Sequence, residues 1–524
     1  MSLPLYTADQ VRALDQQLIA AGTPGISLMQ RAAEAALTVL RQRWPQTTDV
    51  LVLCGRGNNG GDGHVLSGLL LQTGARVHLL QIGDIAKAGA DARQAAANAA
   101  QLGVGALPYD AEQLTALLAQ YSTSPIVIVD AMLGTGFHGA LAGDFADAVG
   151  QVNASGQPIL ALDIPSGLQA DTGHVAGQAI RATITVTFIA RKRGLYTASG
   201  PEYAGEIVFD DCGADALPVD TLRPAIQAID VQLLRHVLRP RPRSAHKGQA
   251  GSVLVIGGDT GFGGAAMLAA EAAARSGAGT VSLLTRPAHV TAMLARRPEV
   301  MVTGMDTWQS DIARQLVEKA SVLIIGPGLG QSRWSRQMLQ NSMMWAVTMA
   351  KPLLLDADAL NLAAQDDSFW RESAPLVQRN RWVITPHPGE AARLLATSVA
   401  QVQCDRFAAI GQLQALTGTQ CLLKGAGSLL AFMPDDGRRD ADGPRLELCT
   451  EGNPGMASGG MGDILTGVIA ALMAQGLSAA DALRCGVCAH GEAADQAVAA
   501  VGERGLLATD VLTYLPQVLN GYHQ

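Results

Sequence analysis

Short apolar runs alternate with longer segments rich in Ala and Leu along the whole chain, and this alternation sets the fold class. In the N-terminal half the runs lie at residues 50–54, 76–82, 126–131, 159–164 and 184–189. Such runs, separated by helix-length segments, are typical of parallel strands with helices on both faces. The alternation restarts at Ser252 with "SVLVIGG" and continues to "QCLLKGAGS". The sequence therefore predicts two doubly wound α/β domains, each a three-layer sandwich, the first of them Rossmann-like.

The domain boundaries follow from where this pattern stops and restarts. We expect a first domain over residues 1–224, a linker over 225–245 and a second domain over 246–524. Pro240 and Pro242 interrupt the basic stretch "LRPRPRSAHKG", which favours a solvated connector over a nucleic-acid patch. A helical lead-in precedes the first sheet, because Thr7 and Gln10 can form a capping box that opens a helix from Ala8 to Ala21.

Composition restricts the partners and the compartment. The formal net charge of -8 argues against general nucleic-acid binding and favours small-molecule partners. We find no signal-peptide pattern and no apolar run of the roughly 18 residues that would span a bilayer, so we expect a cytoplasmic protein without membrane partners. Seven cysteines argue against a disulfide framework. Cys485 and Cys488 form C-x-x-C in a helical pattern, and we expect both to pack in the core, with redox or metal chemistry as the alternative. The sequence does not decide between a monomer and a homo-oligomer.

The stretch "VLVLCGRGNNGGDG" begins as a dinucleotide-binding fingerprint and then departs from it. Gly55, Gly57 and Gly60 satisfy G-x-G-x-x-G directly after an apolar run. A loop that wraps a pyrophosphate needs bare backbone N–H groups, and the carboxylate of Asp62 would repel phosphates there. We therefore expect this loop to bind more than phosphate.

Further polar groups stand where the predicted strands of the first domain end. Asn59, Asp130, Asp163 and Ser166 supply amide, carboxylate and hydroxyl oxygens, which suit an alkali or alkaline-earth cation; loop-capping hydrogen bonds are the alternative. Asp163 is the best candidate for a general acid/base. The glycine-rich turn that begins at Gly134 could bind a diphosphate through its N–H groups.

The motifs "GRGNNGGDG", "VDAMLGTGFHG" and "ALDIPSGL" resemble the NAD(P)H-hydrate epimerase domain over roughly residues 5 to 215. The resemblance implies that Asp163 contacts the nicotinamide-derived end of a hydrated nucleotide and acts in catalysis. It implies a potassium ion on Asn59, Asp130 and Ser166. Lys192 could orient the ligand, but we expect it to be solvated at the surface. The other substrate contacts implied are Asn58, Asn59, Gly60, Gly61, Asp62, Gly134, Thr135, Gly136, Phe137, His138, Gly139 and Ala140.

The stretch "EGNPGMASGGMGDILTGVIAALMAQG" carries the chemistry of the second domain. Gly459, Gly460 and Gly462 lead into an apolar helix, so free N–H groups and the positive helix end would face a phosphoryl group before Asp463. Asp463 would then deprotonate a hydroxyl that attacks this phosphoryl group. Lys424 ends an apolar run and could meet phosphate oxygens.

These features resemble the ribokinase-like superfamily and, more narrowly, its ADP-dependent NAD(P)H-hydrate dehydratases, over about residues 246 to 520. The resemblance implies a ribokinase-like sandwich, a magnesium ion and ADP as co-substrate, with Asp463 as the catalytic base. Substrate contacts would be Ala265, His387, Asp463 and either Gly328 or Gly330. The adenine nucleotide would lie on Lys424, Gly425, Ala426, Gly427, Ser428 and Gly462.

Together the two halves resemble the bifunctional NAD(P)H-hydrate repair enzymes, whose substrates are NADHX and NADPHX. The implied activities are epimerisation of the R and S forms and ADP-dependent dehydration of the S form to NAD(P)H, AMP and phosphate. The alternative is a ribokinase-like vitamin or sugar kinase with a nucleotide-binding N-terminal module; an NAD-dependent dehydrogenase fits less well. The preference between the two hydrates stays open.

Overall fold

The chain folds into two compact units. The structure is a computed structural model that describes residues 3–214, 223–366, 368–372, 375–433 and 444–521. One unit comprises Pro4–Ile226, and the other comprises Gln227–Gln524 together with Leu3. Among the described residues, no helix is long and apolar enough to cross a membrane.

The N-terminal unit is built on one seven-stranded sheet in the order β4-β3-β2-β5-β6-β7-β8, and all its neighbouring strands are parallel. The strands are β2 (Asp49–Cys54), β3 (Arg76–Gln81), β4 (Ala106–Pro108), β5 (Val127–Ala131), β6 (Ile159–Leu162), β7 (Ile184–Phe188) and β8 (Glu206–Asp210). The chain runs outward from β2 through β3 to β4, then returns to β5 on the other side. The loops after β2 and β5 therefore diverge, which opens a crevice at their carboxyl ends.

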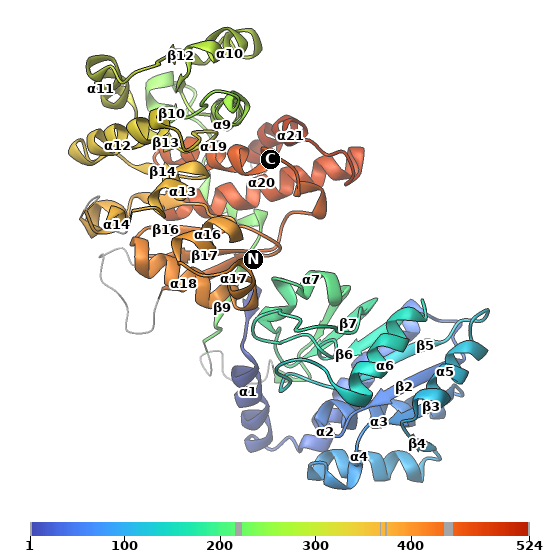
Figure 1. Cartoon of the computed structure of the whole chain (residues 1–524). Helices are drawn as coiled ribbons and strands as arrows, with labels where there is room; N and C mark the ends of the chain where they lie inside the picture. The colour runs from blue at the N-terminus through green and yellow to red at the C-terminus, as the bar shows by residue number, and fades with distance from the viewer. Residues whose placement is uncertain (1–2, 215–222, 367, 373–374, 434–443, 522–524) are drawn as a thin grey trace. The chain divides into compact units, whose positions relative to one another are not determined.

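Alternate residues of β2 face opposite helical layers, as the two-residue period of a strand requires. Val50 and Val52 pack in a cluster with α2 and α3, whereas Leu51 and Leu53 pack in a cluster with α5 and α6. Figure 1 shows these two layers on either side of the sheet. The helices are α1 (Ala8–Ala20), α2 (Gly25–Arg43), α3 (Asn58–Gln72), α4 (Ala90–Gln101), α5 (Ala111–Gln120), α6 (Gly143–Ala154) and α7 (Gly200–Tyr203).

The C-terminal unit is built on an eleven-stranded sheet in the order β1-β9-β18-β17-β16-β15-β14-β13-β10-β11-β12. Strands β10 to β16 pair in parallel, and β17 is antiparallel to both of its neighbours. The switch point lies between β10 and β13, because the chain leaves β10 toward β11 and β12 before it returns. The strands are β1 (Leu3–Leu5), β9 (Ile226–Ile229), β10 (Ser252–Ile256), β11 (Thr280–Thr285), β12 (Met301–Gly304), β13 (Val322–Ile325), β14 (Leu353–Leu355), β15 (Trp382–Ile384), β16 (Gln420–Leu423), β17 (Ser428–Phe432) and β18 (Arg445–Cys449).

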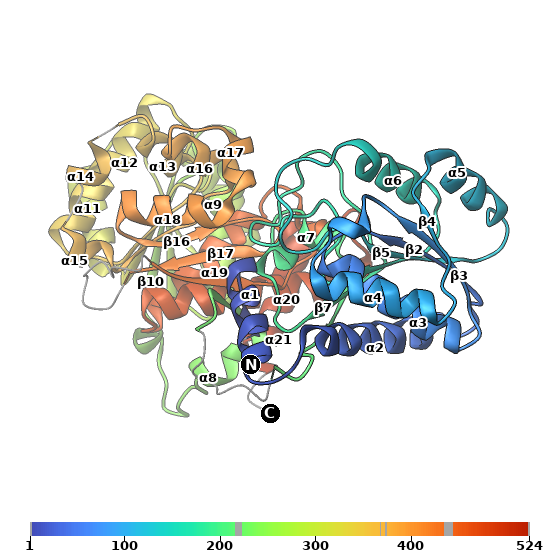
Figure 2. The same ribbon diagram turned by 90° about the horizontal axis from the view of Figure 1, so that it is seen from below.

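Helices cover both faces of this sheet. Figures 1 and 2 show α19, α20 and α21 on one side and α12, α13, α16 and α18 on the other. The core on the first side joins α9, α19, α20 and α21 to buried residues of nine strands. The helices are α8 (Leu234–Val237), α9 (Gly263–Arg275), α10 (Val290–Arg296), α11 (Ser310–Lys319), α12 (Arg333–Thr348), α13 (Asp358–Ala363), α14 (Phe369–Glu372), α15 (Leu376–Arg379), α16 (Pro388–Leu394), α17 (Val399–Cys404), α18 (Arg406–Thr417), α19 (Met461–Ala474), α20 (Ala479–Val501) and α21 (Ala508–Gly521).

The predicted fold class is confirmed, and each strand predicted in the N-terminal half corresponds to one of β2, β3, β5, β6 and β7. The predicted capping box also forms: Thr7 Oγ1 accepts the N–H of Gln10 at 3.2 Å, and Gln10 Oε1 accepts the N–H of Thr7 at 3.0 Å. The edge strands β4 and β8 were missed, because β4 has only three residues and the three apolar residues of β8 are flanked by Glu206 and Asp210.

The structure differs from the expected linker over residues 225–245. Residues 226–229 form β9, which pairs with β18, and α8 follows it. Ile229, Val231 and Leu234 are buried in the core of the C-terminal unit. The apolar residues "IQAIDVQLL" therefore begin the second unit rather than connect the two.

Helices α9 and α19 cross closely at Gly467. A Cβ there would lie 2.3 Å from the carbonyl oxygen of Ala269 and 2.7 Å from the Cβ of Ala272. We expect Gly467→Ala to force the helices apart and to lower the free energy of unfolding by about 1–3 kcal/mol. Gly411→Ala is the matched control, because Gly411 lies within α18 with nothing within 4 Å of its missing Cβ. It should be neutral or stabilising by up to about 1 kcal/mol. Differential scanning calorimetry measures both; equal melting temperatures for the two variants would contradict the close crossing.

Candidate active sites

A cavity of about 700 Å³ lies at the carboxyl ends of β2 and β5, where the strand order of the N-terminal unit reverses (its switch point). It brings together most of the residues predicted to contact a nucleotide there. Asn58, Asn59, Asp62, Gly134, Thr135, Gly136, Phe137, His138 and Asp163 line it. Gly60 and Gly61 are buried in the first turn of α3, and Gly139 and Ala140 are exposed on the outer part of their loop, so these four are not among the lining residues.

The glycines of the fingerprint are required by close backbone approach. A Cβ on Gly55 would lie 1.8 Å from the carbonyl oxygen of Met132, and a Cβ on Gly60 would lie 1.8 Å from that of Gly55. Helix α3 begins at Asn58 without a side-chain cap, so the N–H groups of its first turn are available to an anion. The local chemistry therefore still suits a phosphate beside the polar side chains.

Lys192 is buried, which shows that our expectation of a solvated lysine was wrong. Its side chain is 1% exposed, and its Nζ forms an ion pair with Asp163 Oδ1. The ammonium also donates to Thr187 Oγ1 at 3.1 Å and to the carbonyl oxygen of Phe188 at 2.7 Å. Because a single lysine in a loop gives no signal of burial, only the fold could show this pair. Lys192 fixes the carboxylate of Asp163 at the cavity wall.

The cavity is rich in carboxylates. Burial raises the pKa of Asp62 well above its usual value, and the neighbouring charges of Asp163 and Asp15 raise it further. Burial also raises the pKa of Asp15, to which the charge of Asp91 adds. Lys192 opposes both shifts. The site thus contains carboxyl groups that take up a proton more readily than a solvated aspartate does, which suits proton transfer.

The residues predicted to bind potassium meet beside Leu133. Asp130 is fully buried and accepts the N–H of Ser166 at 2.7 Å and its hydroxyl at 2.6 Å. Asn59 donates from Nδ2 to the carbonyl oxygen of Leu133, and its Oδ1 is buried without a hydrogen-bond partner. Burial raises the pKa of Asp130 to about 6, and no lysine or arginine among the described residues pairs with it. An unpartnered oxygen beside a buried carboxylate fits a monovalent cation.

Three residues other than glycine that line this cavity have left-handed backbone. The φ angles are 66° at Asp163, 66° at Ile189 and 51° at Cys212. Such conformations are costly for residues with a Cβ and cluster at functional sites. Asp163 is held there by its N–H, which donates to the carbonyl oxygen of Val186 at 2.7 Å.

In the C-terminal unit, Asp463 lies in the first turn of α19, three residues after Gly460, which caps the helix with left-handed backbone. Burial raises the pKa of Asp463 to about 7, the charge of Asp356 adds to this effect, and Lys424 opposes it. Lys424 donates to Asp356 Oδ1 at 2.9 Å, and Thr466 donates to Asp356 Oδ2 at 2.7 Å. This buried pair was not predicted, because Asp356 reads in sequence as an ordinary strand-end residue.

Gly462 lies against the same pair. A Cβ there would be 3.1 Å from Lys424 Nζ and 3.8 Å from Asp356 Oδ2. Glu390 approaches from α16, with its Oε2 at 3.9 Å from Lys424 Nζ. Three carboxylates, including Asp463, thus share one ammonium group. An excess of carboxylate oxygens is the donor set that a magnesium ion prefers, and it would otherwise repel a polyphosphate.

The loop Lys424 to Ser428 is organised by a buried arginine that the sequence did not single out. Arg406 is 1% exposed and donates to the carbonyl oxygens of Leu423, Lys424 and Gly427 at 3.2 to 3.4 Å. A Cβ on Gly425 would lie 2.7 Å from this guanidinium. With its carbonyls gathered on Arg406, the loop can direct N–H groups toward an anion on its other side.

His387 caps α16 with its ring. Nδ1 accepts the N–H groups of Gly389 and Glu390 at 2.9 and 3.3 Å, so the proton of the neutral ring is on Nε2. Nε2 lies 3.3 Å from Glu390 Oε1, and the side chain is 51% exposed. Burial and the charge of Lys424 lower the pKa of His387. When the ring is neutral, its N–H is on Nε2, which lies beside Glu390 Oε1 at the surface of the site.

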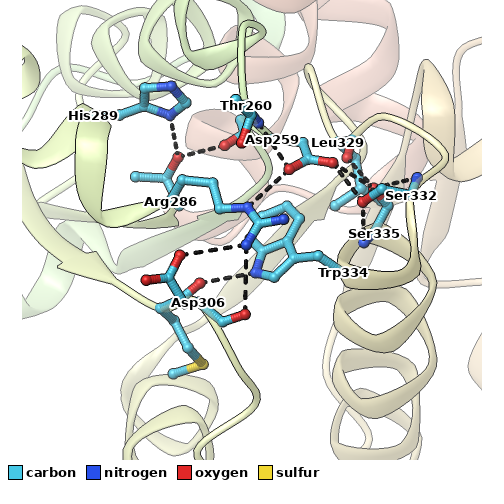
Figure 3. A network of polar contacts seen from close by, with 12 residues as sticks. Asp259, Thr260, Arg286, His289, Asp306, Leu329, Ser332, Trp334 and Ser335 are labelled. Carbon is cyan, nitrogen blue, oxygen red and sulfur yellow. Dashed lines mark hydrogen bonds and ion pairs between the residues drawn. The ribbon is translucent and has the colours of Figure 1, made fainter.

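A polar network joins the loops at the second switch point. Figure 3 shows Asp259 between Arg286 and two serines at the start of α12. Asp259 accepts from Arg286 Nε at 2.8 Å, from Ser332 Oγ at 2.6 Å and from Ser335 Oγ at 3.2 Å. The guanidinium lies 4.6 Å from the ring centre of Trp334. The network ties the loop after β10 to the loop after β13.

This network places two of the predicted substrate contacts side by side. The N–H of Asp259 donates to the carbonyl oxygen of Gly328 at 2.7 Å. A Cβ on Gly328 would lie 3.1 Å from the Cβ of Ala265. Gly330 instead donates its N–H to Asp358 Oδ2 at 2.8 Å. Of the two glycines that the sequence left open, Gly328 is the one against Ala265.

The chain matches two family models. One, described as NAD(P)H-hydrate dehydratase, matches residues 253–517. The other, described as YjeF-related protein N-terminus, matches residues 25–194. The two matches fall on the two structural units.

Relatives and a solved structure agree with this division. The chain is 42% identical over 516 residues to the bifunctional NAD(P)H-hydrate repair enzyme Nnr of Coxiella burnetii, covering 98% of this chain and 99% of that protein. It is 40% identical over 528 residues to the enzyme of the same name from Escherichia coli K12, covering 99% and 95%. A hypothetical protein from Streptococcus mutans superposes with a TM-score of 0.50 at 27% identity, over 57% of this chain and all of that one.

The buried Asp163–Lys192 pair yields a prediction. We expect Lys192→Met to leave the Asp163 carboxylate unpaired and to lower the free energy of unfolding of the N-terminal unit by about 3 kcal/mol. Adding Asp163→Asn should restore part of this loss, by about 1–3 kcal/mol. Lys87→Met is the control, because the Lys87–Asp84 pair is exposed at 3.9 Å and should contribute less than about 1 kcal/mol. Urea unfolding of these three variants and of Asp163→Asn alone completes the cycle; additive effects at Asp163 and Lys192 would refute the pairing.

Proposed function

The chain belongs to the family of bifunctional NAD(P)H-hydrate repair enzymes, and on that premise we propose how its two sites divide the repair. The N-terminal site interconverts the R and S forms of NADHX and NADPHX. The C-terminal site dehydrates the S form at the expense of ADP and gives NAD(P)H, AMP and phosphate. The observation that carries this proposal is that Asp163 lines the cavity of the N-terminal unit beside Lys192, and Asp463 lies in the C-terminal unit among Lys424 and further carboxylates.

In the C-terminal site Asp463 takes the proton of the C6 hydroxyl as this oxygen attacks the terminal phosphoryl group of ADP. The bond from that phosphorus to the bridging oxygen breaks, and AMP leaves. The lone pair of the ring nitrogen then expels phosphate from C6, and loss of a proton from C5 restores the C5–C6 double bond. Phosphate is a far better leaving group than hydroxide, which explains the use of ADP.

Other groups of this site bind and orient the reactants. The loop Lys424–Ser428 binds the adenine nucleotide together with Gly462. Arg406 fixes this loop by donating hydrogen bonds to its carbonyl oxygens. Ala265, Gly328 and the Nε2–H of His387 contact the hydrated nucleotide. Asp356 and Glu390 would hold a magnesium ion, which supplies charge neutralisation on the phosphates.

In the N-terminal site Asp163 takes the proton of the C6 hydroxyl as a C=O bond forms at C6 and the bond from C6 to the ring nitrogen opens, with its electron pair moving to the nitrogen. The nitrogen then adds back to the other face of C6, and Asp163 returns the proton to the oxygen. Lys192 keeps the carboxylate in place and touches no substrate atom in this scheme. Asn58, Asn59 and the Gly134–Ala140 loop bind the nucleotide. Asn59, Asp130 and Ser166 would hold a potassium ion, which supplies a fixed positive charge at the base of these loops.

The kinase alternative is not favoured. Relatives that cover nearly the whole chain are named as repair enzymes, and they account for both units rather than for one. A kinase would retain the phosphate on its product, whereas repair releases it. We place the activity in the cytoplasm, where free thiols such as the seven of this chain stay reduced.

The defining experiment follows near-ultraviolet absorbance of mixed hydrated NADH epimers with this protein, ADP, magnesium and potassium. We expect absorbance to return for both epimers, with one AMP formed for each NADH. Recovery of the S form alone would remove the proposed role of the N-terminal site. A stable phosphorylated product would remove that of the C-terminal site.

The raised pKa of Asp463 predicts a pH dependence. A base must be ionised to act, so kcat for the S form should fall about tenfold per pH unit below the pKa of about 7 and level off above it. Asp463→Asn should lower kcat by about 10²–10⁴-fold or more and leave no such dependence. Stopped-flow absorbance from about pH 6 to pH 8.5 tests this. A flat profile in the unsubstituted protein would contradict the role as base.

Asp163→Asn should separate the two activities. We expect the S form to be repaired at the normal rate, whereas conversion of the R form falls about 10²-fold or more. Asp84→Asn is the control, since Asp84 caps a short helix outside this cavity through the N–H of Ala86. Chromatography of the epimers over time provides the readout. Unchanged R-form conversion in Asp163→Asn would exclude this residue as the acid/base.

A further inference from the structure

Two thiols and a carboxylate that neither reaction uses lie together in the C-terminal unit. Cys449 ends β18, Glu451 follows two residues later, and Cys488 lies in α20. The Sγ atoms of Cys449 and Cys488 are 3.7 Å apart, and Cys449 Sγ is 3.1 Å from Glu451 Oε2. All three donor atoms lie within 4.8 Å of one another. Both cysteines are fully buried.

The spacing of these atoms is that of a tetrahedral metal site. Zinc–sulfur bonds are about 2.3 Å long, so two thiolates on one tetrahedral zinc ion lie about 3.8 Å apart. By the same construction a thiolate and a carboxylate oxygen are about 3.5 Å apart. The observed Sγ–Sγ distance of 3.7 Å matches the first value. The Sγ–Oε2 distance of 3.1 Å is shorter than the second, so the carboxylate would move slightly away from Cys449 when an ion binds.

The donors also have the right chemistry and support. Thiolates select thiophilic ions and exclude magnesium and calcium, and zinc accepts a carboxylate beside them. The other oxygen of Glu451, Oε1, accepts the N–H of Val231 at 2.6 Å. This bond orients the carboxylate so that Oε2 faces the thiols, as outer hydrogen bonds do at metal centres. Glu451 is partly exposed, which leaves a path for an ion.

Only one cysteine of the C-x-x-C motif, Cys488, belongs to this cluster. Cys485 packs in the helical core and is not a member of the cluster. The partner of Cys488 comes from β18, 39 residues earlier in the chain. Both cysteines pack in the core, as expected, and Cys488 in addition has the neighbours of a metal ligand.

We propose that Cys449, Glu451 and Cys488 bind one zinc ion, with water as the fourth ligand. Binding releases the two thiol protons and needs no redox partner. The ion would join the end of β18 to α20 where the loop toward α19 begins. That loop is already held by α20, because Asp495 accepts from the N–H of Gly452 at 3.0 Å and from Asn453 Nδ2 at 2.7 Å. The ion would thus have a structural role, because it would hold the start of the loop that leads to Asp463.

The test measures metal on the full-length chain without an affinity tag, purified without chelator. Elemental analysis should find about one zinc per chain, and Co²⁺ added to the chelator-treated protein should give the near-ultraviolet charge-transfer band of cobalt thiolates. Cys449→Ala and Cys488→Ala should each abolish the band and lower the zinc content about tenfold or more. Zinc should raise the melting temperature of the unsubstituted protein but not that of Cys449→Ala or Cys488→Ala.

Cys485→Ala is the matched control: it removes a buried thiol one turn from Cys488 on the same helix, and it should keep the zinc and the cobalt band. Two hydrogen-bonded thiols would give the same spacing as a metal site, and the metal content separates these cases. The proposal is overturned if the unsubstituted chain holds no more zinc than Cys488→Ala and shows no cobalt band. A Cys449–Cys488 disulfide, found as a peptide pair by mass spectrometry, would overturn it as well. These readouts do not depend on either catalytic activity.

Discussion

Close contact of backbone with backbone at the two switch points is the constraint on which both sites depend. In each unit the residue after a central strand is a glycine whose missing Cβ admits the carbonyl of the neighbouring loop. Gly55 is approached by Met132 in this way, and Gly257 by Pro327, at 1.8 and 2.1 Å from the Cβ position. Any side chain there would push apart the loops that form the crevice. The same backbone contact thus positions the loops of two sites that differ in their chemistry, one in each sheet.

Buried charge then determines what each crevice can do. Asp163 is paired with one lysine and surrounded by further carboxylates, whereas Asp463 shares a single lysine with Asp356 and Glu390. Removing these groups from water raises the pKa of Asp463 to about 7, where a carboxylate can exchange protons at cellular pH. The C-terminal unit therefore has a proton acceptor that a solvated aspartate would not provide.

Residues that carry local signals were predictable. The strands, the capping box at Thr7 and the glycines before Asp463 follow from periodicity and backbone requirements over a few residues. The residues predicted around Asn59 and Asp130 do meet at the carboxyl ends of the strands, because parallel strands end on the same side of a sheet. Lys192 and Arg406 were not predictable, since nothing local distinguishes a buried cation from a solvated one.

The sequence by itself determined the fold class, the two-unit plan, the family resemblance and the two aspartates proposed for catalysis, because alternation, glycine-rich turns and motif order are properties of short segments. Only the tertiary structure decided which groups surround these aspartates and where the second unit begins. It also decided that Cys488 faces Cys449 rather than Cys485. Ion pairs and ligand clusters join segments tens of residues apart, and their partners are selected by strand order and helix packing, which no local pattern encodes.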